Sequence, residues 1–248
     1  MSKTKIYFAS DFHLGVPTHA ESLEREKKII SWLDEIKEDA KSIYLLGDIF
    51  DFWFEYKAVV PKGFVRLLGK LAELSDNGTD IFLIKGNHDL WMYDYLPKEV
   101  GVQIIEDKTI LSENGKKIFL AHGDGLGPGD FGYKMIKKIF TNKMCQWLFT
   151  RLHPNFGLGI AHFWSKRSRI ANNKNPEQFL GEEKEWLVSY CQEKQKENPV
   201  DYYIFGHRHL PLEIEIDTKA KYINLGDWIH HNSYAVFDGE NLILEYLN

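Results

Sequence analysis

Short runs of apolar residues recur along the chain, and several of them stop at a cluster of Gly, Asp, Asn or His. Many of these runs are continuous and rich in β-branched or aromatic residues, which is typical of strands covered on both faces. The pattern predicts buried strands at Ile6–Ser10, Ser42–Leu46, Asp80–Lys85, Lys117–Ala121, Tyr202–Phe205, Tyr222–Leu225, Ser233–Phe237 and Leu242–Leu247.

Two segments between the first three predicted strands have the spacing of amphipathic helices. The apolar residues of Leu23–Ile36 fall on one helical face, and Phe64–Leu74 repeats the spacing. Alternation of strands and helices predicts an α/β core whose early strands are parallel. In the last quarter the predicted strands follow one another closely, which predicts a mixed second sheet. The dipeptide Asp238-Gly239 predicts a hairpin turn there.

Length and composition fit one large domain. The chain has 248 residues, and 44% of them are hydrophobic, which is enough for a sizeable core. We expect a single domain over residues 1–248, with an insertion at about 128–178. The net charge is −5, with 31 basic and 36 acidic residues, so the whole chain has no bias towards nucleic acid or membranes.

Cysteine usage and hydropathy both indicate a cytoplasmic protein. Cys145 and Cys191 form neither a CxxC pair nor a disulfide framework, as is typical of a reducing compartment. The apolar stretch Ile6–Ala9 is too short for a signal peptide. No segment reaches the ~20 apolar residues that a membrane-spanning helix needs. We therefore expect a soluble protein that can still touch a membrane surface.

The stretch from Phe131 to Pro176 differs from the rest in charge. It contains nine Lys or Arg residues and no Asp or Glu, whereas the chain average would give it about seven acidic residues. Eight of its residues are aromatic. Helices predicted within Phe131–Phe149 would share an apolar side formed by Met135, Ile136, Ile139, Phe140 and Trp147.

Three interpretations of this stretch remain open. It could bind an anionic ligand with apolar chains, or a membrane, because it offers both cations and apolar side chains. It could be a helical cap that buries its apolar residues in its own core and leaves its lysines solvated. It could also bind nucleic acid, although it contains no recognisable nucleic-acid-binding module.

Polar motifs follow five of the predicted strands. In chain order they are Asp11-Phe12-His13, Gly47-Asp48-x-x-Asp51, Gly86-Asn87-His88-Asp89, His122-Gly123-Asp124 and Gly206-His207-Arg208-His209. One such motif alone could be an ordinary turn, because Gly, Asn and Asp favour turns. Five in series predict that Asp, Asn and His side chains from distant segments form one metal centre.

These side chains supply the oxygen and nitrogen ligands that divalent cations bind in hydrolytic centres. Gly47 lets the chain turn sharply and expose Asp48, whose two oxygens can bridge two cations. Two cations ~3.5–4 Å apart lower the pKa of a shared water and neutralise phosphate oxygens. The predicted first site is formed by Asp11, His13, Asp48 and His209, and the second by Asp48, Asn87, His122 and His207.

Three further residues of the motifs are predicted to serve catalysis. We assign His88 to stabilisation of transition-state charge or protonation of the leaving group. Asp51 and Asp89 are candidates for holding histidine rings in the correct tautomer. For these two carboxylates the alternative is that they cap a helix or a turn.

The order DxH, GDxxD, GNHD, HGD and GHxH resembles the calcineurin-like metallophosphoesterase superfamily from Asp11 to Asp227. The resemblance implies a four-layer α/β/β/α sandwich, here with a helical insertion forming a cap over the site. It also implies a centre of two Mn, Fe or Zn ions, with Mn²⁺ as our expectation. The superfamily includes protein phosphatases, phosphodiesterases, nucleases and nucleotide pyrophosphatases, so the motifs alone leave the substrate open.

Residues around the motifs narrow the substrate class. A protein phosphatase would carry Arg after Asp51, and this chain has Phe52. The sequence from Gly47 to Trp53 is similar to the Gly-Asp-x-Phe-Asp-x-Trp of the UDP-2,3-diacylglucosamine pyrophosphatases of bacterial lipid A synthesis. That family carries Ser-x3-Asn-x2-Lys in the insertion. Here Ser168-x3-Asn172 matches, but Asn175 stands at the Lys position, with Lys174 one place earlier.

This second resemblance implies a set of substrate contacts. They are Asn87, His88, Asp130, Tyr133, Arg167, Ser168, Asn172, Lys174 and His207. His88 departs from the best-known branch of the family, which has Arg at that position, and agrees with the wider superfamily.

The resemblance implies hydrolysis of UDP-2,3-diacylglucosamine to UMP and 2,3-diacylglucosamine 1-phosphate. The partner would be this lipid-linked nucleotide, with peripheral contact to the cytoplasmic face of the inner membrane and no nucleic-acid or protein partner. A soluble phosphodiesterase or nucleotide pyrophosphatase is the alternative enzyme. A metallophosphoesterase-like scaffold without activity is the alternative outside catalysis, and it is disfavoured because all predicted ligands are present.

Overall fold

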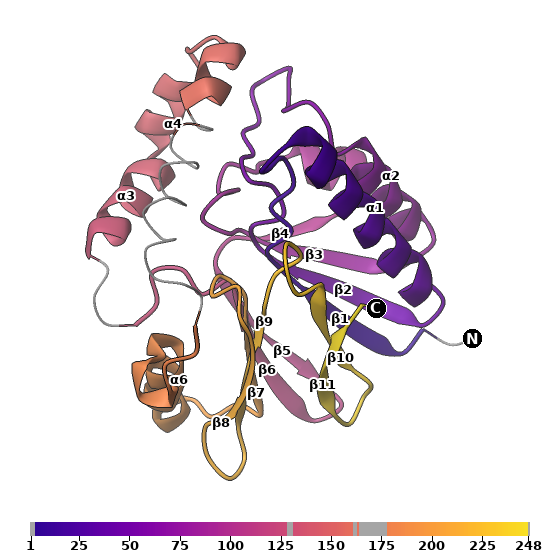
Figure 1. Cartoon of the computed structure of the whole chain (residues 1–248), viewed down its shortest axis with the longest axis vertical. Helices are drawn as coiled ribbons and strands as arrows, with labels where there is room; N and C mark the ends of the chain where they lie inside the picture. Colours follow the sequence, from indigo (N-terminus) through magenta and orange to yellow (C-terminus); the bar gives the residue numbers. More distant parts are fainter. Residues whose placement is uncertain (1–2, 128–130, 161–162, 164–177, 248) are drawn as a thin grey trace.

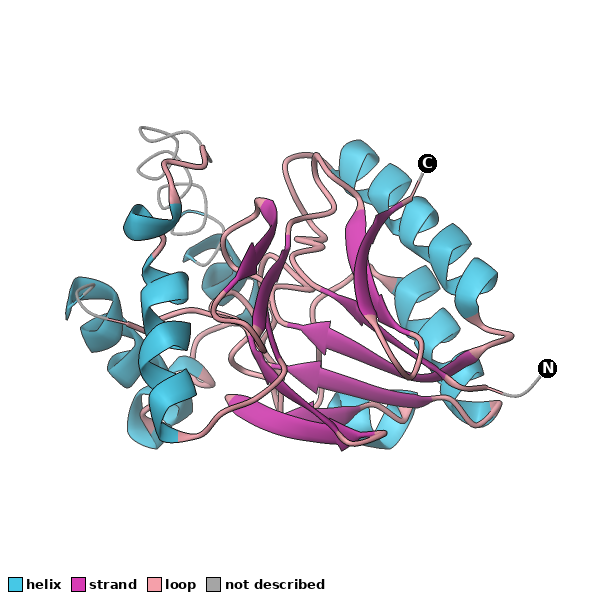
Figure 2. Ribbon diagram, turned by 90° about the horizontal axis from the view of Figure 1, so that it is seen from below, coloured by secondary structure: helices cyan, strands magenta, loops and turns pink. Residues whose placement is uncertain are grey.

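Two β-sheets pack face to face at the centre of the molecule, and helices cover their outer faces (Figures 1 and 2). The computed structural model describes residues 3–127, 131–160, 163 and 178–247, with the side chains of 131–133 excepted. Through this part of the chain the layers run helix, sheet, sheet, helix. The α/β/β/α sandwich expected from the sequence is confirmed.

The first sheet has six strands in the order β11-β10-β1-β2-β3-β4. They are β1 (Lys5–Ala9), β2 (Ala40–Leu46), β3 (Asp80–Ile84), β4 (Gln103–Ile105), β10 (Ser233–Phe237) and β11 (Leu242–Tyr246). Strands β1 to β4 are parallel, whereas β10 is antiparallel to both β1 and β11. Because parallel strands end at one edge of a sheet, the residues that follow β1, β2 and β3 meet there.

The second sheet has five strands in the order β5-β6-β7-β9-β8. They are β5 (Lys108–Glu113), β6 (Lys116–Ala121), β7 (Tyr202–Phe205), β8 (Pro211–Glu215) and β9 (Lys221–Leu225). The central strands β6, β7 and β9 are parallel, and the edge strands β5 and β8 are antiparallel to their neighbours. The sheet is therefore mixed, as predicted.

The outer layers are α-helical. The first sheet is covered by α1 (His19–Ile36) and α2 (Val65–Asp76), followed by the short π-helix η1 (Leu96–Val100), and the second by α6 (Trp186–Glu197) after the 3₁₀ turn η2 (Glu182–Lys184) (Figure 1). Each interface between layers has its own apolar cluster. Trp32 of α1 packs beneath the first sheet, Phe8 lies between the sheets, and Leu187 of α6 packs beneath the second.

The N-terminal amides of α1 and α2 are satisfied by different means. Thr18 accepts an amide of the first turn of α1 at 3.2 Å, which is ordinary N-capping. Phe64, before α2, has no side chain that can do this. Glu26 of α1 accepts the amides of Arg66 and Leu67 instead, both at 3.0 Å. A buried carboxylate therefore joins the two helices.

The structure corrects the predicted arrangement of the last quarter. The expected hairpin at Asp238-Gly239 is present, but its strands β10 and β11 join the first sheet, not the second. Strand β10 pairs with β1, more than 220 residues away, at Ile6↔Phe237 and Phe8↔Ala235. Local hydrophobic periodicity contains no information about such a distant partner, which is why the placement of β10 and β11 in the second sheet was wrong.

Three strands and one helix were absent from the prediction. Strands β4, β5 and β8 lie at sheet edges, where half of the residues face solvent and the apolar pattern is weak. Helix α6 opens with contiguous apolar residues, and its mean amphipathic pattern is faint. The remaining predicted strands and both predicted helices are confirmed to within a few residues at each end.

Helices α3 (Phe131–Thr141) and α4 (Lys143–Phe149) occupy the segment where amphipathic helices were predicted. They stand outside the four layers, on the side away from α1 and α2 (Figures 1 and 2). Asn142 separates them and caps α4 by accepting two amides. Among the described residues, no helix is long and apolar enough to cross a membrane. Cys145 in α4 and Cys191 in α6 are free thiols.

Candidate metal centre

The five polar motifs meet at one edge of the sandwich. Asp11 follows β1, Asp48 follows β2, Asn87 follows β3, His122 follows β6 and His207 follows β7. All five strands are parallel members of their sheets, so their carboxyl ends bring these residues together from both sheets. In the structure, Asp and His side chains of these motifs converge in groups that could hold metal ions.

The first group consists of Asp11, His13, Asp48 and His209. Nε2 of His209 lies 3.1 Å from Oδ1 of Asp11 and 3.1 Å from Nε2 of His13. Nε2 of His13 also lies 3.6 Å from Oδ2 of Asp48. Four donor atoms from three separate strand ends therefore face a common point, and three of the four side chains are buried.

The second group shares Asp48 with the first. Oδ2 of Asp48 lies 3.4 Å from Nε2 of His122, and the same oxygen lies 3.6 Å from Nε2 of His13. The carbonyl oxygen of Asn87 lies 3.0 Å from Nε2 of His122 and 2.9 Å from Nδ1 of His207. One carboxylate oxygen thus faces an imidazole nitrogen of each group, which is the position a bridging ligand requires.

The backbone at this centre is strained. Eight non-glycine residues in the described part of the chain have a positive φ, and five of them are candidate ligands. These five are Asp11, His13, Asp48, His207 and His209, with φ between 42° and 65°. Left-handed conformations cost free energy for residues with a Cβ and persist where the surrounding structure enforces them. The fold therefore holds the donors in place at a cost to its own stability.

Glycine residues of the motifs make room for the donors. A Cβ on Gly86 would lie 2.2 Å from Oδ1 of Asp48, and a Cβ on Gly47 would lie 2.7 Å from Nδ1 of His122. Gly47 also has a φ of +82°. Neither clash could be relieved without moving a candidate ligand, so Gly is required here by close approach as well as by conformation.

The donor set fits divalent cations. Oδ1 of Asp11 is buried and makes no hydrogen bond, although imidazole nitrogens surround it. Burial lowers the pKa of His122, but the charge and hydrogen bond of Asp48, together with the charges of Asp11 and Asp124, outweigh this effect and raise the pKa to about 10. Burial opposes ionisation of Asp48, yet the positive charge that His122 carries holds its pKa well below the usual range. The centre thus favours positive charge beside its carboxylates, and oxygen and nitrogen donors without sulfur suit Mn, Fe or Zn.

Two imidazoles are oriented by backbone carbonyl groups. Nδ1 of His122 donates to the carbonyl of Leu46 at 2.7 Å, so Nε2 is the nitrogen that faces Asp48 and Asn87 and that would bind a cation. Nδ1 of His88 donates to the carbonyl of Asp51 at 2.9 Å. A hydrogen bond to the far nitrogen fixes the tautomer that a ligand or a general acid needs.

His88 and Asp51 lie against the first group. The rings of His88 and His13 are perpendicular, with centroids 5.0 Å apart. Oδ1 of Asp51 lies 3.7 Å from Nδ1 of His88 and 3.9 Å from Nδ1 of His13, so this carboxylate lies near two imidazoles. The side chain of His88 is 16% exposed, which makes it more accessible than His13 at 4%.

The contacts of Asp89 differ from the prediction that it orients a histidine. Its two oxygens accept backbone amides of Gly86, Asp48, Ile49 and Phe50 at 2.8 to 3.4 Å. The carboxylate therefore ties the loop after β3 to the loop after β2, and the turn-capping alternative describes it better. Burial, together with the charge of Asp48, raises the pKa of Asp89 to about 7.

Sequence reasoning missed a buried arginine behind the first motif. Arg25 of α1 is 6% exposed. It donates to the carbonyls of Phe12 and His13, each at 2.7 Å, and to that of Val16. These bonds hold the turn that places Asp11 and His13 in their left-handed conformations. An amphipathic helix with a charged residue on its buried face was the signal available, because buried arginine is rare without partners.

Arg208, inside the last motif, turns away from the metal centre. Its guanidinium makes two bonds to the carboxylate of Glu185, at 3.1 and 3.0 Å, and lies over the ring of Trp186. Glu185 is buried and precedes α6. The pair therefore anchors the segment between His207 and His209 to the helix of the second sheet.

The helices α3 and α4 are tied to the motif loops. Nζ of Lys137 lies 2.6 Å from Oδ2 of Asp124, two residues after His122. Nε1 of Trp91 donates to the carbonyl of Phe140 at 2.6 Å. Phe149 packs on an aromatic platform, with centroids 4.7 Å from Phe54 and 4.8 Å from Trp91. Lys137, one of the nine basic residues, is therefore paired rather than simply solvated.

Much of the apolar surface of this segment faces outward. Among the described residues, the exposed large apolar side chains here are Met135, Ile139, Met144, Trp147, Leu148, Phe156 and Phe163. Trp147 is 54% exposed and Phe156 62%. The alternative in which the segment buries Met135, Ile139 and Trp147 in its own core is wrong. Exposed aromatic and aliphatic residues beside lysines are typical of surfaces that meet lipids or other partners.

The structure describes the positions of only some of the residues that were predicted to contact the substrate. Asn87, His88 and His207 lie at the centre. Five of the predicted contacts and the side chain of a sixth fall outside the described residues; they are Asp130, Arg167, Ser168, Asn172, Lys174 and Tyr133.

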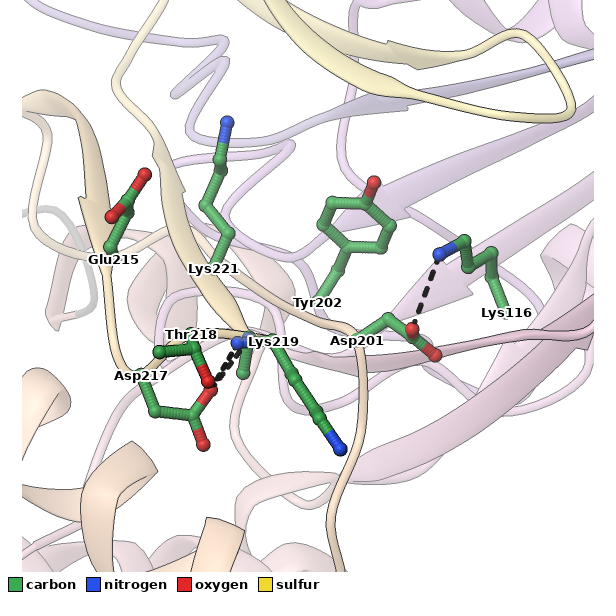
Figure 3. Close-up of a pocket in the computed structure, with 9 residues that line it drawn as sticks. Lys116, Asp201, Tyr202, Glu215, Asp217, Thr218, Lys219 and Lys221 are labelled. Carbon is green, nitrogen blue, oxygen red and sulfur yellow. Dashed lines mark hydrogen bonds and ion pairs between the residues drawn. The ribbon is translucent and has the colours of Figure 1, made fainter.

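A polar cavity lies at the end of the second sheet that is opposite to the metal centre. It has a volume of about 200 Å³ and is lined by Lys116, Asp201, Tyr202, Glu215, Asp217, Thr218, Lys219, Ala220 and Lys221 (Figure 3). Lys116 pairs with Asp201 at 3.4 Å, and Asp217 accepts two backbone amides of its own turn. The cavity lies at the starts of β6, β7 and β9, far along the sheet from the metal centre at their ends.

The fold and the donor set together define a metal-dependent phosphoesterase. The profile of the calcineurin-like phosphoesterase family matches residues 4–211, and the chain belongs to this family.

Relatives cover almost the whole chain. A protein of Porphyromonas gingivalis named UDP-2,3-diacylglucosamine hydrolase is 41% identical over an alignment that covers 98% of this chain and 97% of the relative. A protein of the same name from Edwardsiella ictaluri is 28% identical, over 96% of this chain and 90% of the relative. Among solved structures, Vps29 of Chaetomium thermophilum is 9% identical and has a TM-score of 0.47. The match covers 98% of this chain and 95% of that one, and the likeness is weak.

Proposed function

We propose that the protein hydrolyses the pyrophosphate bond of UDP-2,3-diacylglucosamine, giving UMP and 2,3-diacylglucosamine 1-phosphate. The main observation in support is that seven donor residues converge into two groups that share Asp48. The substrate is proposed from the relative of that name with 41% identity across nearly the full length of both chains. The exposed apolar and basic surface of the described insertion residues, next to this centre, fits a substrate that is both anionic and lipidic.

The proposed ligands follow the two groups. Asp11, His13, Asp48 and His209 would hold one cation, and Asp48, Asn87, His122 and His207 the other. Bound there, divalent cations supply Lewis acidity for phosphoester hydrolysis. Manganese is our proposal for their identity, because a site of imidazole, carboxylate and amide ligands without thiolate accepts it.

His88 is the proposed group for the leaving oxygen. Its hydrogen bond from Nδ1 to the carbonyl of Asp51 turns Nε2 away from that carbonyl. Its partly exposed ring stands beside His13, where a phosphate would lie between the cations and solvent. From this position it stabilises charge on the phosphate or gives a proton to the departing group. Asp51 keeps the rings of His88 and His13 in place.

We propose that residues 128–178 form the insertion that recognises the rest of the substrate. Lys137 and Trp91 anchor it to the loops of the centre, while Trp147 and Phe156 remain exposed for acyl chains. Asp130, Tyr133, Arg167, Ser168, Asn172 and Lys174 are proposed to contact the sugar and phosphates, together with Asn87, His88 and His207. The same surface would bring a cytoplasmic enzyme to the inner membrane, where its substrate resides.

The direct test is release of UMP. Purified protein with Mn²⁺ should release UMP from UDP-2,3-diacylglucosamine in mixed micelles. An otherwise identical nucleotide sugar without acyl chains should be turned over far more slowly. Cleavage of a chromogenic phosphodiester without UMP release from the lipid nucleotide would refute the substrate and keep the chemistry.

A further inference from the structure

Asp227 is a completely buried carboxylate in the loop after β9, outside the five polar motifs. Its loop is fastened to the first motif in two ways. The amide of Trp228 donates to the carbonyl of Asp11 at 3.2 Å, and the ring of Trp228 packs on Phe12 with centroids 5.2 Å apart. The position of Asp227 is therefore set by the same turn that carries Asp11 and His13.

One oxygen of Asp227 builds its own loop. Oδ1 accepts the amide of His230 at 2.9 Å and the amide of His231 at 3.1 Å. Nδ1 of His231 lies 3.1 Å from the same oxygen. These contacts are those of an Asp that closes a turn, and an uncharged side chain with one acceptor oxygen would provide most of them.

The other oxygen faces the metal centre. Oδ2 of Asp227 is buried and has no hydrogen-bond partner among the described residues. It lies 3.7 Å from Nδ1 of His209, a separation that makes the contact electrostatic. Nε2 of the same ring lies 3.1 Å from Oδ1 of Asp11. The imidazole of His209 is thus placed between two buried carboxylates, one on each side.

We infer that Asp227 is a positioning residue for His209, a statement that rests on the proposed metal centre. A carboxylate beside Nδ1 favours the tautomer with the proton on that nitrogen, so the lone pair of Nε2 points to the cation. It also makes the imidazole a stronger ligand, because negative charge behind the ring favours binding of positive charge in front of it. Oδ1 holds the loop and Oδ2 directs the ligand.

The two oxygens of Asp227 have different contacts, so a substitution can remove one set of contacts and keep the other. In Asp227→Asn, the amide oxygen keeps the turn at His230 and His231, and the amide nitrogen faces Nδ1 of His209. An N–H group there favours the opposite tautomer, with the proton on Nε2, the nitrogen that should bind the cation. We expect the affinity for one of two Mn²⁺ ions to fall 10- to 100-fold in calorimetric titration, and the other to stay unchanged.

Two companion variants exclude a general loss of structure. Asp227→Ser keeps one acceptor for the turn and removes the oxygen facing His209, so it should show the same selective loss. Glu26→Gln changes another buried carboxylate, one that accepts the backbone amides of Arg66 and Leu67 at α2, and should bind both ions as the wild type does. At saturating Mn²⁺, kcat of both Asp227 variants should recover towards the wild-type value, because the substitutions weaken metal binding and leave the catalytic groups in place.

The outcomes separate this inference from the proposed function. Unchanged affinity for both ions in Asp227→Asn and Asp227→Ser would overturn the positioning role while leaving the two-metal centre intact. Equal loss at both ions, with a lowered melting temperature, would show that Asp227 only builds its loop. If the wild type itself bound fewer than two ions, the proposed centre would fail, and the inference would fall with it.

Discussion

The metal centre and the segment 131–160 are adjacent in space and opposite in construction. The centre is built from strand ends of both sheets, is mostly buried, and holds five of its residues in left-handed conformations. The segment is helical and presents side chains such as Met144 and Phe156 to solvent at 69% and 62% exposure. Its described attachments to the centre include the Lys137–Asp124 pair and the aromatic platform around Phe149.

This difference indicates which region determines substrate specificity. Donors for two cations must keep their geometry to a fraction of an ångström, and a doubly layered core with little free volume provides this rigidity. A lipidic substrate must enter and leave, and an exposed apolar surface on separate helices permits this without disturbing the ligands. Changes to the centre should therefore abolish all activity, whereas changes to the segment should discriminate between substrates.

The largest effect should come from a lost donor shared by both groups. Asp48→Asn removes the charge that faces His13 and His122 and should lower kcat more than 100-fold with lipid and small substrates alike, because both proposed cations lose a ligand. The measurement is initial rate at saturating Mn²⁺ with each substrate. Wild-type turnover of either substrate by this variant would exclude the shared-ligand arrangement.

The next prediction concerns stability, at Arg25 behind the first motif. Arg25→Met removes three hydrogen bonds to buried carbonyls and should lower the free energy of unfolding by about 3 kcal/mol, since each group would be left unsatisfied. Urea unfolding of the metal-free protein measures this. Lys27→Met, on the exposed side of the same helix, is the control and should change stability by less than ~0.5 kcal/mol.

Substrate discrimination should appear only in the helical segment. Replacing Trp147 and Phe156 together by Asp should reduce kcat/KM for the lipid nucleotide about 10-fold and leave hydrolysis of a chromogenic diester unchanged. The ratio of the two rates is the quantity to measure. Equal losses with both substrates would mean that the segment supports the centre and does not recognise lipid.

The smallest effect concerns the attachment between the two regions. Lys137→Met removes the ion pair with Asp124, which is 4% exposed, and should loosen α3 by about 1 kcal/mol. Hydrogen exchange of the α3 amides should accelerate accordingly, with the strands of both sheets unaffected. Lys138→Met, the adjacent lysine, should leave the exchange of α3 unchanged.

The sequence predicted the centre better than it predicted the sheets around it. His13, Asn87 and His209 could be placed because each stands in a short polar motif after an apolar run, a pattern that survives without knowledge of distant partners. The pairing of β10 with β1 could not, because nothing local in Ser233–Phe237 distinguishes one sheet from the other.

Supporting residues were predictable only in part. Asp51 lies near two histidine rings, whereas Asp89 accepts backbone amides, and both arrangements suit the same residue type in the same kind of motif. Arg25 and Asp227 stand outside the motifs, and their partners are carbonyls and a ring contributed by other segments. Such contacts depend on the assembled fold, so they appear only in three dimensions.

The pairing of β10 with β1 has a consequence for biosynthesis. The first candidate ligand is residue 11 and the loop carrying Asp227 is complete only at about residue 231, after which β10 adds the strand beside β1. A nascent chain therefore carries Asp11, His13 and Asp48 long before His207, His209 or the strand that flanks β1 has been synthesised. Contacts of such long sequence separation form late, so productive metal loading should follow the synthesis of β10.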